Sequence, residues 1–280
     1  MPASEFAAAK VNLALHITGQ RDDGYHLLDS LVGFASIGDT IEAAISDRYS
    51  LTTTGDFATQ MPPVADNLIT KAVDWFAKKT GQDGRVAITL EKNLPSAAGI
   101  GGASADAAAV VRALARLWDQ PLPGPKEMLF LGADVPMCLA SRLCRAQGIG
   151  EDLSPAGALF GLSVVLVNPR VAVPTPQVFA ALDSRNNPPM SARVGIDNPE
   201  KFLAWLSKQR NDLQETALSI APEIAPVLAA LNDTTPDLAR MSGSGATCFA
   251  LYHSAQSAAK AARELAKNHP NWWVVTGHLL

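Results

Sequence analysis

A glycine-rich segment in the first half of the chain has the residue types that bind phosphate groups. In LPSAAGIGGASADAAA, residues 94–109, Gly99, Gly101 and Gly102 allow the backbone to turn sharply and to lie close to a ligand. An alanine-rich stretch with strong helix propensity follows, with Ser104 at its start. Helix N-termini leave amide groups unpaired and carry positive partial charge, so this loop is suited to a phosphate.

The same segment also fits a tight strand-to-helix turn in which the glycines serve packing alone. It is not a Walker loop, because no Gly-Lys-Ser/Thr follows the glycines. It is also a poor dinucleotide fingerprint, because Pro95 separates it from the preceding strand. Taken alone, the loop leaves phosphate binding and packing equally open. Lys92, just upstream, adds a positive charge.

Three polar residues elsewhere have side chains suited to transfer chemistry. Lys10 and Asn12 are two residues apart, so on a strand both side chains lie on the same face. Asp134 lies in the short loop GADVP, residues 132–136. Taken alone, Asp134 fits a turn or capping residue and Lys10 a solvated lysine at a strand start. Asn12 alone fits a polar strand residue bonded to a neighbour.

Three motifs, in this order along the chain, together resemble those of the GHMP kinases. AAAKVNLALHITGQRDDGYHLLDS, residues 7–30, is similar to the family's N-terminal motif. PSAAGIGGASADAAA resembles its phosphate loop, P-x-x-x-G-L-G-S-S-A, and MSGSGATCFALY, residues 241–252, resembles its third motif. DGYH, GADVP, NDL at 211–213 and PTP at 174–176 resemble the branch that phosphorylates a cytidine diphosphate-linked polyol. The resemblance covers nearly the whole chain, and DGYH and GADVP are its most specific parts.

The resemblance implies a catalytic pair. Asp134 becomes the aspartate that accepts the proton of the substrate hydroxyl, and Lys10 lies beside it, where its charge favours the developing alkoxide. Phosphoryl transfer has a loose transition state, so positioning and charge stabilisation matter more than a strong base. Asn12 is implied to lie near the substrate's hydroxyls. Gly243, within the third motif, is expected to support the site and its closing rather than to bind phosphate.

The resemblance also implies a cytidine pocket and an ATP site. Tyr25 would stack on the cytosine and His26 would hydrogen-bond the edge of the base. Phe179, which without the resemblance is a core aromatic, would cover the opposite face, and Thr175 and Pro176 would shape the wall. Residues implied to contact ATP are Asn67, Lys92, Pro95, Ser96, Ala97, Ala98, Gly99, Ile100, Gly101, Gly102, Ala103 and Ser104.

The implied reaction is transfer of the γ-phosphate of ATP to the 2-hydroxyl of that polyol, in non-mevalonate isoprenoid precursor biosynthesis. ATP would carry Mg²⁺, and no tightly bound cofactor or dedicated metal site is expected, because the sequence has no cluster of carboxylates. The alternatives are another GHMP kinase, such as one acting on homoserine or mevalonate, a nucleotide-binding protein without catalysis, and an NAD-dependent oxidoreductase. Lys10 and Asp134 together argue against the non-catalytic alternative.

Composition narrows the class of protein. The 280 residues suggest two domains or one large one, and the 48% hydrophobic and 18% charged content is typical of a globular chain. A net charge of −4 argues against a general nucleic-acid binder. No apolar run is long enough for a membrane span, and no secretory signal is readable.

The three cysteines, without a CxxC pair, suggest free thiols in a reducing cytoplasm rather than a zinc site. The protein is expected to be a monomer or homodimer without nucleic-acid or membrane partners.

Hydrophobic periodicity and turn residues predict mixed strands and helices. Leu31–Ala35 and Thr40–Ala44 are expected as two strands joined by a turn at Gly38–Asp39, and SRNNPP at 184–189 as a linker or surface loop. The other expected strands are 11–17, 85–91, 162–167, 248–252 and 272–276. The expected helices lie at about 67–80, 104–117, 202–206, 220–231, interrupted near its two prolines, and 255–267.

These elements predict an α+β protein with the two-domain GHMP kinase fold. By resemblance, residues 1–155 form the N-terminal ATP-binding domain with a left-handed βαβ unit, and residues 156–280 form a ferredoxin-like C-terminal domain. The chain departs from the family pattern at Ala103 and Ala105, where relatives commonly have glycine and serine. The segment 119–131 is also shorter than expected, so a helix there is predicted to be missing or reduced to a turn.

Overall fold

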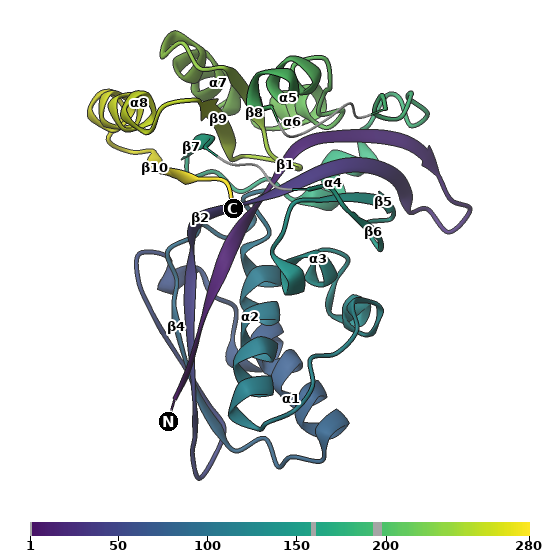
Figure 1. Ribbon diagram of the computed structural model, residues 1–280, viewed down its shortest axis with the longest axis vertical. Coiled ribbons are helices and arrows are strands. Elements are labelled where there is room, and N and C mark those ends of the chain that lie inside the picture. Colours follow the sequence, from purple (N-terminus) through teal and green to yellow (C-terminus); the bar gives the residue numbers. More distant parts are fainter. Residues whose placement is uncertain (1, 158–160, 193–197) are drawn as a thin grey trace. The chain divides into compact units, whose positions relative to one another are not determined.

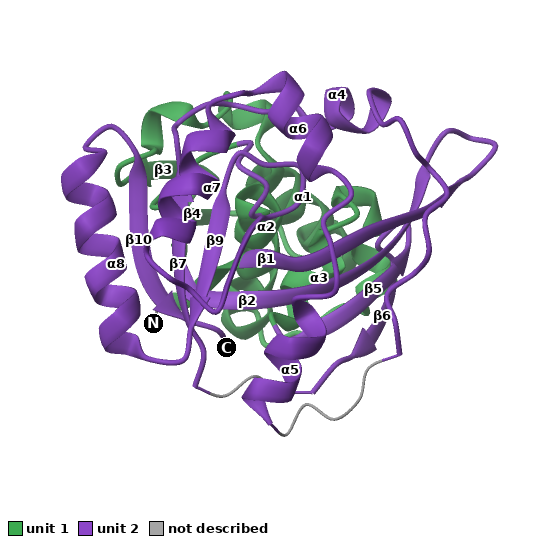
Figure 2. Ribbon diagram, turned by 90° about the horizontal axis from the view of Figure 1, so that it is seen from above, with its two compact units in different colours: residues 1–9, 38–96, 101–141 green, residues 10–37, 97–100, 142–280 purple. Residues whose placement is uncertain are grey.

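The computed structural model describes residues 2–157, 161–192 and 198–280. The chain forms two compact units, coloured separately in Figure 2. Unit 1 comprises residues 1–9, 38–96 and 101–141, and unit 2 comprises residues 10–37, 97–100 and 142–280. Strands β1 (Ala3–Gln20) and β2 (His26–Ile45) contribute residues to both units.

Unit 1 contains a βαβ unit, as predicted. Strand β4 pairs in parallel with β3 and antiparallel with the second half of β2, and α1 connects β3 to β4. Helix α1 begins where Asn67 caps it by accepting a hydrogen bond from the amide of Ile69, and ends at Gly81, whose φ is 72°. The elements of unit 1 are β3 (Ser50–Thr54), η1 (Ala58–Gln60), η2 (Val64–Asp66), α1 (Leu68–Thr80), β4 (Val86–Glu91), α2 (Gly102–Leu117), η3 (Pro125–Leu131) and α3 (Val135–Ala140).

The predicted turn at Gly38–Asp39 is wrong, because β2 is continuous through both residues. A Cβ on Gly38 would lie 2.3 Å from the carbonyl oxygen of Ala7 and 2.7 Å from the ring of Phe6. Gly38 therefore allows the close approach of β1, and its φ is not in the left-handed region. Sequence alone does not separate a turn glycine from a packing glycine.

Unit 2 contains the predicted ferredoxin-like arrangement. Its antiparallel sheet has the order β10-β7-β9-β8. Along the chain, β7 is followed by helices α4 to α7, then by β8, β9, α8 and β10, which is the ferredoxin-like order with additional helices after the first strand. Helices α7 and α8 cover one face of this sheet (Figure 1). The elements of unit 2 after β2 are β5 (Cys144–Gly148), β6 (Asp152–Pro155), β7 (Ser163–Asn168), α4 (Thr175–Ala180), α5 (Pro199–Leu206), α6 (Gln214–Ile220), α7 (Ile224–Asp233), β8 (Leu238–Met241), β9 (Cys248–Tyr252), α8 (Ala255–Asn268) and β10 (Trp273–His278).

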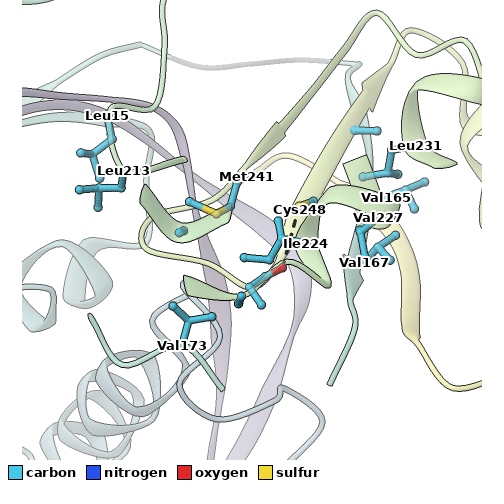
Figure 3. Close-up of a cluster of buried hydrophobic side chains, with 14 of the residues drawn as sticks. Leu15, Val165, Val167, Val173, Leu213, Ile224, Val227, Leu231, Met241 and Cys248 are labelled. Atoms are coloured by element: carbon cyan, nitrogen blue, oxygen red, sulfur yellow. Dashed lines mark hydrogen bonds between the residues drawn. The ribbon is translucent and has the colours of Figure 1, made fainter. Parts of the chain in front are cut away.

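Side chains of this sheet and of the helices packed on it form a buried apolar cluster (Figure 3). Val165 and Val167 of β7, Ile224 of α7 and Met241 of β8 contribute to it, and all four side chains are fully buried. Every residue of β7 is buried, which explains why its sequence is apolar without alternation. This core fixes the end of β8, from which the third motif starts.

Most other predicted elements are confirmed, with one further correction. The interruption expected near the two prolines of 220–231 is confirmed at Pro222, since α6 ends at Ile220 and α7 begins at Ile224, but Pro226 does not interrupt the helix. Pro226 lies in the first turn of α7, where a missing amide hydrogen removes no intrahelical bond. The segment 184–189 belongs to unit 2 as a loop, and 119–131 is reduced to the 3₁₀ helix η3. The proposed domain boundary at 155/156 remains a prediction.

Candidate active site

The predicted phosphate loop connects β4 to α2 through backbone conformations that favour glycine. Gly99 has a φ of 75° and Gly101, the residue before the helix, a φ of 64°. Gly101 has no side chain with which to cap α2, so the amides of the first turn receive no side-chain cap. Helix α2 begins at Gly102, two residues before Ser104, which therefore lies within the first turn. An anion at this end of α2 would meet unpaired amide groups and the positive end of the helix dipole.

The apex of the loop, residues 97–100, is held within unit 2 by three consecutive carbonyl groups. The carbonyl of Ala98 accepts from the amide of Thr247 at 3.1 Å, and that of Ile100 accepts from the amide of Lys10 at 3.0 Å. Between them, the carbonyl of Gly99 accepts from the hydroxyl of Ser242 at 3.0 Å. These bonds join the loop apex to β1 and to the third motif.

The third motif forms a glycine turn between β8 and β9. Gly243 and Gly245 have φ values of 56° and 85°, and a Cβ on Gly99 would lie 2.4 Å from the carbonyl oxygen of Ser242. The side-chain amide of Asn211, from the NDL motif, donates to the carbonyls of Met241 and Gly243 at 2.9 and 2.8 Å. The turn therefore contacts the loop apex through Ser242 and Thr247, and the supporting role expected for Gly243 remains a prediction.

Lys10 and Asn12 lie together on β1, as their spacing predicted. The ammonium of Lys10 donates to the Asn12 side-chain oxygen at 2.7 Å, and the Asn12 amide nitrogen donates to the hydroxyl of Ser30 at 2.8 Å. Both side chains are buried. Burial raises the pKa of the nearby Cys144 thiol to about 11, although the charge of Lys10 partly opposes this. Cys144 therefore remains a thiol at neutral pH.

His26 and Phe179 are also brought together. His26 opens β2 and Phe179 lies on α4, with ring centroids 5.1 Å apart and a 39° angle between ring planes. The His26 Nε2 atom is buried and has no hydrogen-bond partner among the described residues. Burial and the charge of Arg185 lower the pKa of His26, which favours the neutral ring. A neutral histidine with an unpaired buried nitrogen beside an aromatic ring is suited to a planar polar ligand.

The remaining predicted pocket residues differ in exposure. Tyr25 precedes His26 and is 59% exposed. Thr175 and Pro176 begin α4, and the hydroxyl of Thr175 shares a hydrogen bond of 2.7 Å with that of Ser244 in the glycine turn. This bond connects the proposed pocket wall to the support of the phosphate loop within unit 2.

Asp134 is in the position immediately before α3, but its side chain does not cap that helix. Helix capping, one of the alternatives left open by the sequence, is therefore not its role in the described structure. The side chain is partly buried in unit 1. Its catalytic role remains a prediction.

Asn67 and Lys92, both expected to contact ATP, have other partners here. Asn67 is buried and its side-chain oxygen caps α1. Lys92 is 2% exposed and its ammonium contacts Asp39 and Asp106. Their contact with ATP remains a prediction.

Sequence reasoning missed three residues that support the site. Ser242 and Asn211 lie in motifs already recognised, but nothing in those motifs identifies the groups they bond. Arg240 is buried, and its guanidinium donates to the carbonyls of Leu13 and Gln209, both at 2.7 Å. Burial lowers the pKa of Arg240 to about 10, which still leaves it charged at neutral pH.

Comparison with known proteins defines the class first. The family models of the GHMP kinases N terminal domain and C terminal domain match residues 67–142 and 196–271. A homoserine kinase from Cytophaga hutchinsonii shares the fold, with a TM-score of 0.70 at 16% identity over 99% of this chain and 95% of that one. The protein is thus a small-molecule kinase of the GHMP class, as the motifs predicted.

Closer relatives define the family within that class. The 4-diphosphocytidyl-2-C-methyl-D-erythritol kinase of Ruegeria pomeroyi is 52% identical over 286 aligned positions, covering 100% of both chains. That of Cereibacter sphaeroides is 51% identical over 98% of each chain. A crystal structure of 4-(cytidine 5'-diphospho)-2C-methyl-D-erythritol kinase matches with a TM-score of 0.83 and 31% identity, over 98% of this chain and 99% of that one. The chain therefore belongs to the 4-diphosphocytidyl-2-C-methyl-D-erythritol kinase family.

Two further features concern the whole described chain. No helix within residues 2–157, 161–192 and 198–280 is long and apolar enough to cross a membrane. Cys138, Cys144 and Cys248 are buried, and no disulfide joins them.

Proposed function

We propose that this protein transfers the γ-phosphate of ATP to the 2-hydroxyl of 4-diphosphocytidyl-2-C-methyl-D-erythritol, giving ADP and the 2-phosphate. The observation that carries the proposal is the 52% identity over the whole length to a kinase of that name. The reaction belongs to non-mevalonate isoprenoid precursor biosynthesis. We place it in the cytoplasm, in keeping with three buried cysteines that form no disulfide.

The pocket of His26 and Phe179 supports a cytidine-bearing acceptor. Cytosine is planar and carries both donors and acceptors, so it suits the neutral His26 ring, whose Nε2 lacks a partner among the described residues. Phe179, 5.1 Å from His26 between centroids, supplies an apolar face, and the exposed Tyr25 is available to stack on the base. An acceptor without the base would leave the buried nitrogen unpaired, which is how such a pocket discriminates.

The chemistry needs charge placement more than covalent participation by the protein. Asp134 accepts the proton of the attacking hydroxyl, and Lys10, held by Asn12, supplies positive charge for the developing alkoxide. The amides at the start of α2 bind the phosphates of ATP. Mg²⁺, bound with ATP, would offset the negative charge of the phosphates.

The proposal is tested by measuring ADP release with magnesium and each of three acceptors: 4-diphosphocytidyl-2-C-methyl-D-erythritol, homoserine and mevalonate. The expected result is turnover with the cytidine-bearing acceptor alone. Asp134→Asn and Lys10→Met should each lower kcat by about a hundredfold or more, because each removes an interaction made in the transition state. The exposed Lys126→Met serves as the matched control and should retain full activity.

Two outcomes would overturn parts of this proposal. Turnover with homoserine or mevalonate, and none with the cytidine-bearing acceptor, would keep the kinase class and remove the cytidine pocket. ATP binding without turnover on any acceptor would indicate a nucleotide-binding protein without catalysis. A His26→Phe variant adds a specific check, since it should raise the KM of the acceptor about tenfold or more and leave that of ATP unchanged.

A further inference from the structure

Unit 1 buries a cluster of three charged side chains that the proposed reaction does not use. Lys92, just after β4, donates to Asp39 of β2 at 2.5 Å and to Asp106 of α2 at 2.8 Å. The three side chains are 2%, 0% and 1% exposed, respectively. Burying charges is expensive unless they are paired, and here one ammonium serves two carboxylates.

This environment argues against a direct contact between Lys92 and ATP. To reach a nucleotide, the ammonium would have to leave both carboxylates in a site closed to water. Burial by itself lowers the pKa of Lys92, but the charges of Asp106 and Asp39 outweigh burial and raise it. Lys92 is therefore held as a cation by these two partners.

The cluster holds both arms of the phosphate loop. On the first arm, the second carboxylate oxygen of Asp39 accepts from the backbone amides of Asn93 and Leu94, at 2.6 and 2.8 Å, directly before Pro95. On the second arm, Asp106 lies in the second turn of α2. A Cβ on Gly102, the first residue of α2, would lie 3.1 Å from the Lys92 ammonium nitrogen, so the charge is directly against the helix start.

The backbone of Lys92 is also fixed. Its amide donates to the carbonyl of Thr54 at 2.7 Å, and its carbonyl accepts from the amide of Phe57 at 3.0 Å. A Cβ on Gly55 would lie 2.6 Å from that carbonyl oxygen, so the neighbouring chain is packed tightly against it. The ammonium is thus presented to Asp39 and Asp106 from a backbone with little freedom to move.

We propose that Asp39, Lys92 and Asp106 are positioning residues that hold the two arms of the phosphate loop in the geometry that binds the phosphates of ATP. The inference rests on the proposed function, because it takes the loop to be the nucleotide site. This arrangement would preorganise the loop. The amides at the start of α2 would then bind the phosphates without the entropic cost of ordering the loop on binding.

One atom of the cluster has no partner. The Oδ1 atom of Asp106 is buried and has no hydrogen-bond partner in the described part of the chain. Burial raises the pKa of Asp106, and the charge of Lys92 opposes this. The Asp106 carboxylate therefore relies on the Lys92 ammonium, which its other oxygen contacts at 2.8 Å.

The experiment measures binding of a non-hydrolysable ATP analogue with magnesium, and of adenosine, by calorimetry without any acceptor. Lys92→Met and Asp39→Asn should each weaken binding of the analogue about tenfold and change adenosine binding by less than about twofold. The double variant should bind the analogue no more weakly than the more affected of the two single variants, because both changes disrupt the same cluster. Asp106→Asn should likewise weaken binding of the analogue and leave adenosine binding changed by less than about twofold, because it removes one of the two partners of Lys92. Lys78→Met, an exposed lysine of α1, is the matched control.

Each contrary result points to a different explanation. If Lys92 were a direct ligand, Lys92→Met would weaken binding while Asp39→Asn left it unchanged or tighter. Equal losses for the analogue and adenosine would reduce the cluster to a structural role. If Lys92→Met does not fold, the binding of Asp39→Asn and Asp106→Asn decides between these explanations. If the unmodified protein did not bind ATP, the proposed function itself would be wrong. If the unmodified protein turned over and the cluster variants bound the analogue equally well, only the positioning role would be wrong.

Discussion

The hydroxyl of Ser242 joins two parts of the site at the scale of single residues. It accepts from the backbone amide of Asn12 at 3.1 Å and donates to the carbonyl of Gly99 at 3.0 Å. Lys10 and Asn12 reach the phosphate loop through this hydroxyl and through the bond from the Lys10 amide to Ile100. One side-chain oxygen therefore links the proposed catalytic strand to the nucleotide loop within unit 2.

Ser242→Ala should lower the free energy of unfolding by about 1–3 kcal/mol, because it leaves a buried amide and a partly buried carbonyl without their partner. The kcat should fall by more than the KM of the acceptor rises, since the loop loses its register with β1. Denaturant unfolding and steady-state kinetics measure both effects. The exposed Ser257→Ala is the control, and equal behaviour of the two variants would show that the hydroxyl carries no such link.

His16 is a second informative residue, because it is fully satisfied as a neutral ring. Its Nδ1 lies 3.1 Å from the carbonyl oxygen of Pro188, and its Nε2 accepts from the amide of Arg210 at 3.2 Å. Burial lowers the pKa of His16, with the Pro188 carbonyl opposing this in part. Protonation would place a hydrogen on Nε2 and break the bond from Arg210.

Stability should therefore fall in acid. Between the lowered pKa of folded His16 and the ordinary histidine value of about 6.5, the unfolded chain binds more protons. The contribution of His16 is complete above about 6.5 and is lost as pH falls through that window. Urea unfolding at pH 7.5 and 5.5 should show a smaller difference in His16→Gln than in the unmodified protein. The exposed His278→Gln should keep the full difference, and a flat profile in the unmodified protein would contradict the prediction.

At the scale of helices and strands, two glycines are required for different reasons, one for packing and one for backbone conformation. Gly38 interrupts the apolar sequence of β2 because β1 passes close to it, whereas Gly81 ends α1 in the left-handed region, and a Cβ added there would have no atom within 4 Å. The first position requires the absence of a side chain, and the second requires a positive φ.

Gly38→Ala should lower the free energy of unfolding by about 3 kcal/mol, because the added carbon meets the Ala7 carbonyl and the strands must move apart. Gly81→Ala should lower it by about 1 kcal/mol, from the strain of an alanine at positive φ. Denaturant unfolding of the two variants side by side tests the order. A larger loss at Gly81 would mean that β2 bends readily at Gly38.

For the whole molecule, the proposed reaction takes magnesium together with ATP, and the described residues contain no group of three or more His, Cys, Asp or Glu side chains that could hold a metal ion. Removal of the ion should therefore stop catalysis and leave the fold intact. Excess chelator should reduce ADP release to background and leave the Tm, measured without nucleotide, unchanged within about 1 °C. Adding magnesium back should restore the rate. A drop in Tm with chelator would reveal a structural ion.

The family and most local elements could be predicted from the sequence, because short stretches of residues determine both. DGYH and GADVP predicted the branch of the GHMP kinases, and the relatives that are about half identical to this chain bear it out. The helix predicted over about 67–80 is found at Leu68–Thr80, and Lys10 and Asn12 were predicted to share a face from their spacing alone. The ferredoxin-like and βαβ arrangements followed from the family.

The partners of these residues, in contrast, depend on the folded chain. Gly38 is a strand glycine rather than a turn, and Lys92 is held by two carboxylates that lie 53 and 14 residues away. The amide of Asn12 donates to Ser242, which lies 230 residues away in the sequence, and no local sequence pattern predicts such a partner. The short strands β3, β5, β6 and β8 were not predicted for the same reason. Hydrogen bonds between distant segments, and the space left between them, are set by how the whole chain packs.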